Sequence, residues 1–349
     1  MSWPQKASIT QGVVDMLRVN VGLQAGEKLL VVTDVPRVQD WQSQGQTDLE
    51  DMLERAVLAR LVADIAAESC PDCSVQFHPF PSGGLHGSEP DRATAQRMKR
   101  ADVVIALTTC SLSHTSARQE ATKAGGRVAS MPVFEARLFK AGGPMAVDHQ
   151  QMAAACQAFA GRLTAADSVI LLTPYGTDLR FSLKGRPGQV DTGLYTEAGL
   201  WGNLPGGEAY AVPLEGTAEG QLVVPAGWYP RLAEDLVLRF EKGGVVEVLG
   251  GGAVGEEFRR AFNPRSDDRV FRTRRNLAEL GIGTNPNARK PDNVLEAEKI
   301  KGTVHIGIGD NLHIGGRVEA DLHDDFVQPK PDLFLDGKPV IVGGEWKIE

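Results

Sequence analysis

Cysteine is scarce in this chain. Four cysteines occur in 349 residues, at positions 70, 73, 110 and 156, which is too few and too scattered for a disulfide framework. We therefore expect free thiols. Cys70 and Cys73 form a CxxC pair, but no second pair of this kind and no nearby pair of histidines completes the four ligands of a structural zinc site.

Basic clusters and long apolar runs are missing too. The longest basic blocks are RMKR at 97–100 and RTRR at 272–275, and the formal net charge is −8, so nucleic acid is not expected as a partner. No run reaches about 18 apolar residues, the length that a membrane-spanning helix requires. The N-terminus, MSWPQKASIT, lacks the basic and apolar regions of a signal peptide. These absences predict a cytoplasmic protein without a membrane partner.

The composition that remains is that of an ordinary globular protein, and its length corresponds to about two domains of roughly 150 residues each. In the first half, short apolar runs alternate with helical patterns. Strands are predicted at 28–34, 74–80, 102–108 and 127–130, and helices at 49–69, 91–100 and 116–124. This alternation predicts an α/β domain with a doubly wound parallel sheet over residues 1–164.

A helical pattern at 150–163 closes the first half, after which the chain becomes rich in glycine and turns. The strands predicted here are 168–173, 179–183, 221–225, 235–240 and 244–249, and brief helices are predicted at 256–262 and 295–300. The second half, residues 165–349, is therefore predicted to be an α+β domain.

Two segments of the second half combine a polar side chain with glycines on one face of a strand. In TVHIGIG, His305, Gly307 and Gly309 alternate with three apolar residues, so the two sets point to opposite faces. ELGIG at 279–283 repeats the arrangement, with Glu279 followed by glycine at the second and fourth positions. Glycine inside a strand often marks the close approach of a ligand or of another backbone. Both segments are therefore candidate ligand faces.

Further metal-ligand candidates flank these segments. In VEADLHDDF at 318–326, a predicted strand, His323 and Asp325 share one face and can reach one ion, and Glu208 follows the tight turn of Pro205, Gly206 and Gly207. The candidate metal ligands are Glu208, Glu279, His305, His323 and Asp325. Carboxylates and imidazoles without thiolates suit zinc, cobalt, manganese or iron(II), and more than one carboxylate per histidine suits a two-metal site.

The motifs GTDLRFSLKGR, GNLPGGEAY, ELGIGTNPNA and EKIKGTVHIGIGDN, with the H-x-D of LHDDFV, resemble the thermophilic aminopeptidase T and aminopeptidase S family of dinuclear metallopeptidases, which are leucyl aminopeptidase-like. The resemblance implies that the same five residues bind two divalent ions of zinc, cobalt or manganese. It also implies peptide substrates, a homodimer, and hydrolysis of the N-terminal residue by a metal-bridged water. Glu279 or Glu208 would move the proton to the leaving amine.

The chain departs from that family at one catalytic position. Family members carry a tyrosine a few residues after the strand histidine, whereas this chain has Leu312 there and tyrosines only at 175, 195, 210 and 229. His313 is the nearest candidate to replace it as a catalytic residue, since it follows His305 by eight residues and would share its strand parity.

Two alternatives stay open. The chain is also similar to mononuclear Fe(II) ring-cleaving dioxygenases of the dihydroxypyridine type, which resemble the same fold family. Those enzymes have histidine where this chain has Glu279, and an apolar residue where it has His305. His305, His323 and Asp325 could still form the two-histidine, one-carboxylate triad of iron oxygenases. The other alternative is a metal-binding relative without catalysis, which the missing tyrosine suggests.

Overall fold

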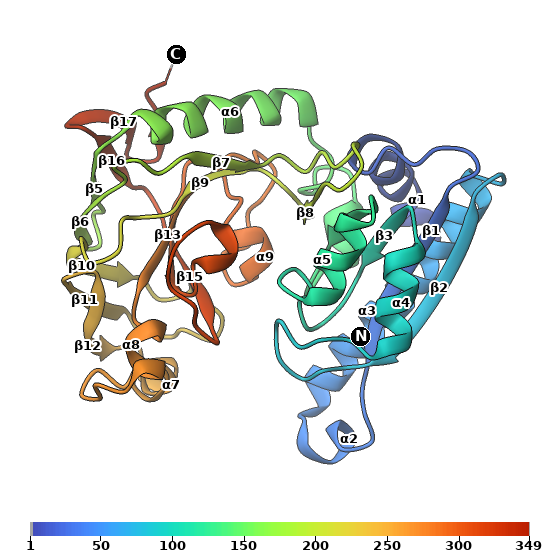
Figure 1. The fold of residues 1–349 in the computed structure, drawn as a ribbon, viewed down its shortest axis with the longest axis horizontal. Coiled ribbons are helices and arrows are strands. Elements are labelled where there is room, and N and C mark those ends of the chain that lie inside the picture. Colours follow the sequence, from blue (N-terminus) through green and yellow to red (C-terminus); the bar gives the residue numbers. More distant parts are fainter. Residues whose placement is uncertain (1–2, 349) are drawn as a thin grey trace. The chain divides into compact units, whose positions relative to one another are not determined.

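The structure is a computed structural model that describes residues 3–348, apart from the side chain of residue 294. The chain forms two compact units, of which the first comprises Met1–His149 and Gly193–Gly206, and the second comprises Gln150–Thr192 and Gly207–Glu349 (Figure 1). The predicted division between residues 164 and 165 differs from these units in two ways. Helix α6 (His149–Ala165) belongs almost wholly to the second unit, and residues 193–206 return to the first, where β8 (Trp201–Asn203) pairs with β4 (Arg127–Ser130).

The first unit is built on a five-stranded parallel sheet with the order β2-β1-β3-β4-β8. Its other strands are β1 (Lys28–Val35), β2 (Ser74–Pro81) and β3 (Val103–Ala106). The β1, β3 and β4 strands are buried almost throughout, which is typical of a parallel sheet covered on both faces. All four strands and all three helices predicted for residues 28–130 are present within a few residues of their expected ends.

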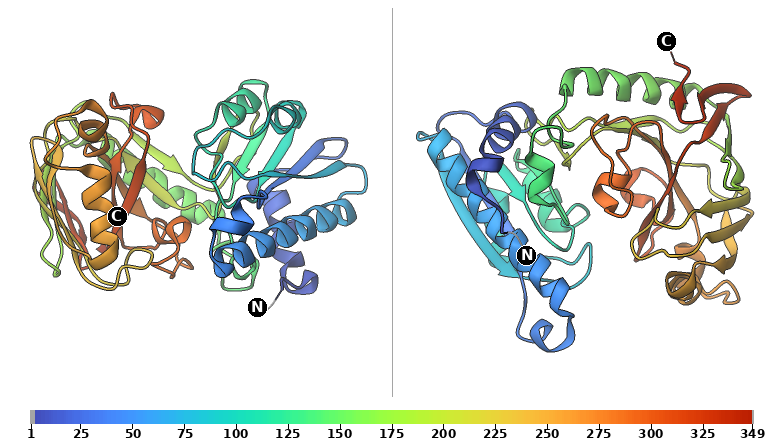
Figure 2. Two further views of the ribbon diagram at one scale, coloured as in Figure 1. Left: turned by 90° about the horizontal axis from the view of Figure 1, so that it is seen from below. Right: turned by 180° about the vertical axis from the view of Figure 1, so that it is seen from behind.

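Helices cover both faces of this sheet (Figure 2). They are α1 (Lys6–Asp15), which continues as a π-helical turn (Met16–Asn20), α2 (Asp40–Ser43), α3 (Gln46–Ser69), α4 (Arg92–Arg100), α5 (Ser116–Lys123) and a 3-10 turn (Ala136–Phe139). The α4 and α5 helices lie on one face, and α1 and α3 lie on the other. Side chains fix where two of them begin, because Asp91 accepts hydrogen bonds from the backbone of Ala93 and Thr94, and Thr115 accepts one from Arg118.

The second unit contains two antiparallel sheets. Its eight-stranded sheet has the order β12-β11-β10-β6-β5-β16-β17-β18, and its five-stranded sheet has the order β15-β14-β13-β9-β7. The strands are β5 (Ser168–Leu172), β6 (Asp178–Ser182), β7 (Gly188–Asp191), β9 (Glu208–Ala211), β10 (Glu219–Val224), β11 (Leu236–Glu241), β12 (Gly244–Gly250), β13 (Leu277–Gly283), β14 (Val304–Gly309), β15 (His323–Gln328), β16 (Asp332–Leu335), β17 (Lys338–Val342) and β18 (Glu345–Trp346). The helices besides α6 are α7 (Gly252–Phe262), α8 (Arg269–Arg274), α9 (Val294–Ala297) and a 3-10 turn (Leu312–Ile314).

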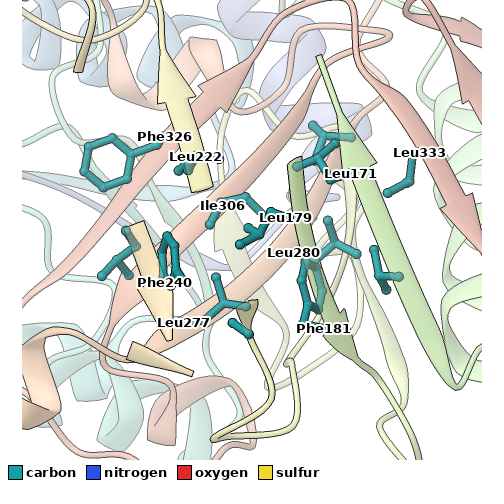
Figure 3. Close-up of a cluster of buried hydrophobic side chains, with 14 of the residues drawn as sticks. Leu171, Leu179, Phe181, Leu222, Phe240, Leu277, Leu280, Ile306, Phe326 and Leu333 are labelled. Atoms are coloured by element: carbon teal, nitrogen blue, oxygen red, sulfur yellow. The ribbon is translucent and has the colours of Figure 1, made fainter. Parts of the chain in front are cut away.

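One apolar core joins the two sheets of the second unit (Figure 3). Leu171, Leu179 and Leu222 enter it from the eight-stranded sheet, and Leu280 and Ile306 enter it from the five-stranded sheet. Burying a side chain of this size contributes roughly 1.5–3 kcal/mol. The core therefore fixes one face of the five-stranded sheet. At the level of fold class the chain is mixed α/β, as predicted. One unit holds a parallel sheet with helices, and the other holds antiparallel sheets.

The expectation of four free thiols is wrong for two of them. Cys70 and Cys73 form a disulfide, which becomes possible because the turn after α3 brings their Cα atoms to 5.4 Å. Cys110 and Cys156 are free. Within residues 3–348, none of the helices has both the length and the apolar character that a membrane span requires.

Candidate metal site

All five predicted metal ligands lie on one face of the five-stranded sheet. The opposite face packs in the core, where Val304, Ile306 and Ile308 of β14 are fully buried. The alternation predicted for 304–309 and 279–283 is therefore present. It leaves the second face to the polar side chains, which are also buried: Glu208 is 7%, Glu279 8% and His305 1% exposed.

The strand register places a glycine opposite every one of these ligands. The pairs are Glu208 with Gly283, Glu279 with Gly307, His305 with Gly281, His323 with Gly309, and Asp325 with Gly307. A side chain on one strand thus lies over bare backbone of its neighbour. This pattern lets donors from β9, β13, β14 and β15 converge.

None of these four glycines could carry even a methyl group without a clash, and at two of them the methyl group would meet the ligands themselves. A Cβ at Gly281 would lie 2.0 Å from Nε2 of His305. One at Gly307 would lie 2.8 Å from Nε2 of His323 and 2.9 Å from Oδ1 of Asp325. The absence of these side chains therefore creates the space in which the donors meet.

The donor atoms form two groups that share Glu279. Glu208, Glu279 and His305 make up one, and Glu279, His323 and Asp325 make up the other, with the ligand atoms of each group within 4.8 Å of one another. Nε2 of His323 lies 3.4 Å from Oε2 of Glu279 and 3.3 Å from Oδ1 of Asp325. Nε2 of His305 lies 3.6 Å from Oε1 of Glu279 and 3.4 Å from Oε2 of Glu208.

Two buried carboxylate oxygens in these groups, Oε2 of Glu208 and Oδ1 of Asp325, accept no hydrogen bond. Buried acceptors without a partner are rare because they lose hydration without compensation. A cation would provide the missing partner, and imidazole and carboxylate donors suit the divalent ions of iron, manganese and zinc. The residues present therefore fit a metal ion.

A further contact fixes the orientation of one ligand. Nδ1 of His323 donates a hydrogen bond to the carbonyl oxygen of Asp310, at 2.6 Å. In the neutral ring, Nε2 then carries the lone pair and faces Glu279 and Asp325, the arrangement that metal-binding histidines usually adopt.

His313 lies beside this group, although not for the predicted reason. The β14 strand ends at Gly309, so His313 shares no strand parity with His305 and lies in the 3-10 turn instead. Its Nδ1 contacts the carboxylate of Asp310, and its ring centroid lies 5.2 Å from that of His323. The turn brings it close, while its role as a catalytic residue stays a prediction.

The strand predicted at 318–326 is shorter than expected. The β15 strand begins at His323, because the preceding residues are held elsewhere: Asp321 pairs with Arg274 at 2.6 Å, and the backbone N–H of Ala320 donates to Asp310. His323 and Asp325 keep the shared face that was predicted for them.

Lys299 belongs to the site and was missed in the sequence. Its ammonium is fully buried and lies 2.5 Å from Oε1 of Glu208 and 3.3 Å from Oε2 of Glu298. Burial lowers the pKa of Lys299, but the neighbouring carboxylates outweigh burial and raise that pKa well above its ordinary value. Burial also raises the pKa of Glu298, to about 8. No periodicity sets Lys299 apart, since it follows a helix of a single turn.

Tyr210 was missed as well. It follows Glu208 by two residues on β9, while Ala209 and Ala211 enter the core, so it shares the ligand face. The alternation in EAYA was the available signal. Burial, with the negative charges of Glu279 and Glu208, raises the pKa of Tyr210 far above its usual value.

We expect metal binding to weaken as the pH falls below about 9. Burial lowers the pKa of His305, but Glu279 and Glu208 outweigh it and raise the pKa to about 9. Nε2 of His305 lies 3.6 Å from Oε1 of Glu279, which both donor groups share, so the positive charge of a protonated His305 opposes a cation in either group. Cation binding should therefore release this proton below that pH. Calorimetric titration of the metal-free protein with Mn²⁺, in buffers of different ionisation enthalpy, measures both the affinity and the protons released.

The same shift predicts how the stability of the metal-free chain depends on pH. The raised pKa of His305 contributes stability that is fully present below the ordinary value of 6.5 and is lost as the pH rises through about 9. Metal affinity and metal-free stability should therefore change in opposite directions over this range. An affinity for Mn²⁺ that stays constant across it would contradict the assignment of a protonated imidazole.

The sequence of this chain is similar to that of a family of ring-cleaving enzymes. The family model of 2,5-dihydroxypyridine 5,6-dioxygenase matches residues 20–347. A relative from Pseudomonas putida, named 2,5-dihydroxypyridine 5,6-dioxygenase, is 25% identical over 270 residues, which cover 72% of this chain and 73% of the relative.

Two solved structures share the fold. The structure of 2,5-dihydroxypyridine dioxygenase from Pseudomonas putida aligns with a TM-score of 0.74 and 19% identity, over 98% of this chain and 97% of that one. AmpT from Thermus thermophilus, an aminopeptidase T, aligns with a TM-score of 0.62 and 17% identity, over 98% of this chain and 100% of that one. The chain therefore shares its fold with both proteins.

The prediction of a metallo-aminopeptidase is wrong, and with it the prediction of a hydrolase that acts on peptides. It rested on motifs and metal ligands, which identify a fold and a metal site more directly than a reaction. The match over residues 20–347 is to a dioxygenase family, and the relative from Pseudomonas putida carries the same name. The alternative considered from the sequence, a ring-cleaving dioxygenase, agrees with these findings. The chain belongs to the 2,5-dihydroxypyridine 5,6-dioxygenase family.

Proposed function

We propose that this chain is a metal-dependent dioxygenase that opens a dihydroxylated pyridine ring, with 2,5-dihydroxypyridine as the first substrate to test. The observation that carries the proposal is the donor group of buried Glu279 and partly buried His323 and Asp325, which lies within the region matched to the dioxygenase family. An oxygenase of this kind needs a metal ion with ligand positions left open for other molecules. Three protein donors would leave such positions.

The proposed ligands of the metal are Glu279 on β13 and His323 and Asp325 on β15, the two strands that flank β14. An Fe²⁺ ion bound there would supply the one-electron chemistry that allows an aromatic ring to react with dioxygen. The set contains one imidazole and two carboxylates, whereas the common triad of iron oxygenases contains two imidazoles and one carboxylate. Glu279 thus takes the place of one histidine. The group of Glu208, Glu279 and His305 is where the second ion predicted from the sequence would bind.

Neighbouring residues would prepare the site for this reaction. The Asp310 carbonyl holds the His323 ring so that Nε2 faces Glu279 and Asp325. His313, with its Nδ1 against the Asp310 carboxylate, would take a proton from a ring hydroxyl at its other nitrogen. The apolar layer beneath the sheet, including Ile306, keeps water away from the ligands on one side.

Oxygen uptake by protein loaded with different metals tests the proposal. The metal-free chain is loaded with Fe²⁺ without air and then mixed with aerated 2,5-dihydroxypyridine, and the same protein loaded with Zn²⁺ serves as the control. We expect the iron form to consume one molecule of oxygen per ring opened and the zinc form to consume none. Equal turnover by both forms, or none by the iron form with its metal bound, would refute an iron-dependent dioxygenase.

Replacing His313 by alanine tests its proposed role as a proton acceptor. We expect kcat to fall by about 10²- to 10⁴-fold, the usual contribution of a general acid or base, while the metal stays bound. His78→Ala is the matched control, because His78 contacts Thr94 in the first unit. An unchanged kcat with full metal content would show that His313 is a bystander.

A further inference from the structure

Lys299 is a charged residue inside the candidate metal site. It follows α9 and is held by its backbone, since its N–H donates to the carbonyl of Glu296 at 3.1 Å and its own carbonyl accepts from the N–H of Asn285 at 2.8 Å. Its side chain is 1% exposed. The position of the ammonium is therefore fixed by the fold and is shielded from solvent ions.

The ammonium shares a carboxylate with one of the two donor groups. Nζ of Lys299 lies 2.5 Å from Oε1 of Glu208, while the other oxygen, Oε2, lies 3.4 Å from Nε2 of His305. A cation bound by Glu208, Glu279 and His305 would therefore sit on the same carboxylate as a positive charge that is already there. The ammonium and the cation would then be held by the two oxygens of one carboxylate, and two positive charges this close repel strongly where water is excluded.

The second donor group is different in this respect. The ion-pair partners of Lys299 are Glu208 and Glu298, and neither belongs to the group of Glu279, His323 and Asp325. A cation in that group would share no carboxylate with the ammonium. The two groups are therefore unequal, although each offers three donors.

We propose that the Lys299 ammonium acts as a built-in cation at the Glu208 end of the site, so that the chain binds a single divalent ion, at Glu279, His323 and Asp325. The inference rests on the proposed function for the choice of those three ligands. Lys299 is a positioning residue here: it decides where the metal binds and touches neither the ring nor oxygen. Five potential metal ligands and one bound ion are then compatible.

A lysine that only supports the fold predicts the opposite response to its removal. If Lys299 merely held Glu208 in place, its loss would loosen a ligand and weaken metal binding. If it acts as a built-in cation, its loss frees Oε1 of Glu208 and removes the repulsion, so a second ion enters. The sign of the change separates the two roles.

Metal content and affinity of four proteins test the proposal without any measurement of turnover. The proteins are the unchanged chain, Lys299→Met, Glu208→Gln and the double variant, each made metal-free and titrated with Mn²⁺ by calorimetry and elemental analysis. We expect one ion per chain in the unchanged protein and in Glu208→Gln. Lys299→Met should bind a second ion at least about tenfold more tightly than the unchanged protein does, and the double variant should return to one ion.

Lys301→Met is the matched control, because Lys301 is exposed and lies over the ring of Trp346; its metal content should not change. Two ions in the unchanged chain, or Lys299→Met with one ion and equal or weaker affinity, would overturn the proposal. If Lys299→Met does not fold, Glu208→Gln decides: loss of metal or of affinity there would overturn the proposal, and no change would support it.

The metal content tests the role of Lys299, and oxygen uptake tests the proposed function, so the two can fail independently. A chain that binds one ion but consumes no oxygen with 2,5-dihydroxypyridine would leave the role of Lys299 intact and refute the dioxygenase. A chain that binds two ions but opens the ring would refute the role of Lys299 and support the dioxygenase.

Discussion

Glu279→Gln is expected to lose the metal ion and the oxygenase activity together. Glu279 is shared by both donor groups, with one carboxylate oxygen 3.4 Å from Nε2 of His323 and the other 3.6 Å from Nε2 of His305. Glutamine keeps the shape but removes the charge that attracts a cation. Since the loss of a residue that only supports a metal ligand already costs about 10- to 100-fold in affinity, we expect the loss of this ligand to cost at least about 100-fold.

Glu247→Gln is the matched control for this prediction. Glu247 lies on β12 in the same unit and forms an exposed ion pair with Arg239 at 3.0 Å, and such pairs contribute little. Elemental analysis after dialysis, together with oxygen uptake, gives both readouts. Full metal content and turnover in Glu279→Gln would contradict its place as a central ligand.

Gly307→Ala is expected to damage the site with the smallest possible change of side chain. The new methyl carbon would lie 2.8 Å from Cβ of Glu279 and from Nε2 of His323, and 2.9 Å from Oδ1 of Asp325. Glu279 cannot give way easily, because its Cβ is tied to the backbone of β13. Such overpacking typically costs about 1–3 kcal/mol of stability. It also separates the donors, so we expect metal affinity to fall by at least about tenfold.

Gly161→Ala provides the comparison, since it makes the same substitution in α6, where an added Cβ meets nothing within 4 Å. It should leave metal binding unchanged and keep or raise the stability by about 0.5–1 kcal/mol. Chemical unfolding of both metal-free variants, followed by titration with Mn²⁺, separates folding from metal binding. Unchanged affinity in Gly307→Ala would mean that the donors meet elsewhere.

Local patterns in the sequence predicted the ligand strands well. The alternation around His305 and Glu279 identified the ligand face, because side chains of a strand alternate with a period of two and the apolar residues had to enter the core. The glycines added the information that something lies close to the backbone. Their structural meaning, that each one faces a ligand on the neighbouring strand, depends on strand order and register and could not be read locally.

The contacts that the sequence did not reveal are between residues far apart in the chain. Lys299 meets Glu208 only because β9 and the turn after α9 both lie next to β13. His313 reaches the site through a turn that strand periodicity does not describe. The disulfide between Cys70 and Cys73 depends on the turn after α3. Each of these follows from tertiary structure.

The sequence predicted the metal site better than it predicted the reaction. Carboxylates and imidazoles on this fold predicted a metal site, but Lewis-acid hydrolysis and oxygen chemistry both use such ligands. The missing tyrosine and Leu312 were signs against a peptidase. Only the match over residues 20–347 decided between the two classes.

Isotope labelling tests the proposed dioxygenase most directly. The chain is loaded with Fe²⁺ and supplied with 2,5-dihydroxypyridine under ¹⁸O₂ in ordinary water, and the ring-opened product is analysed by mass spectrometry. A dioxygenase inserts both atoms of one oxygen molecule, so we predict a product that carries two ¹⁸O atoms. A product that takes its new oxygen from water, or no product from protein that holds its iron, would contradict the account.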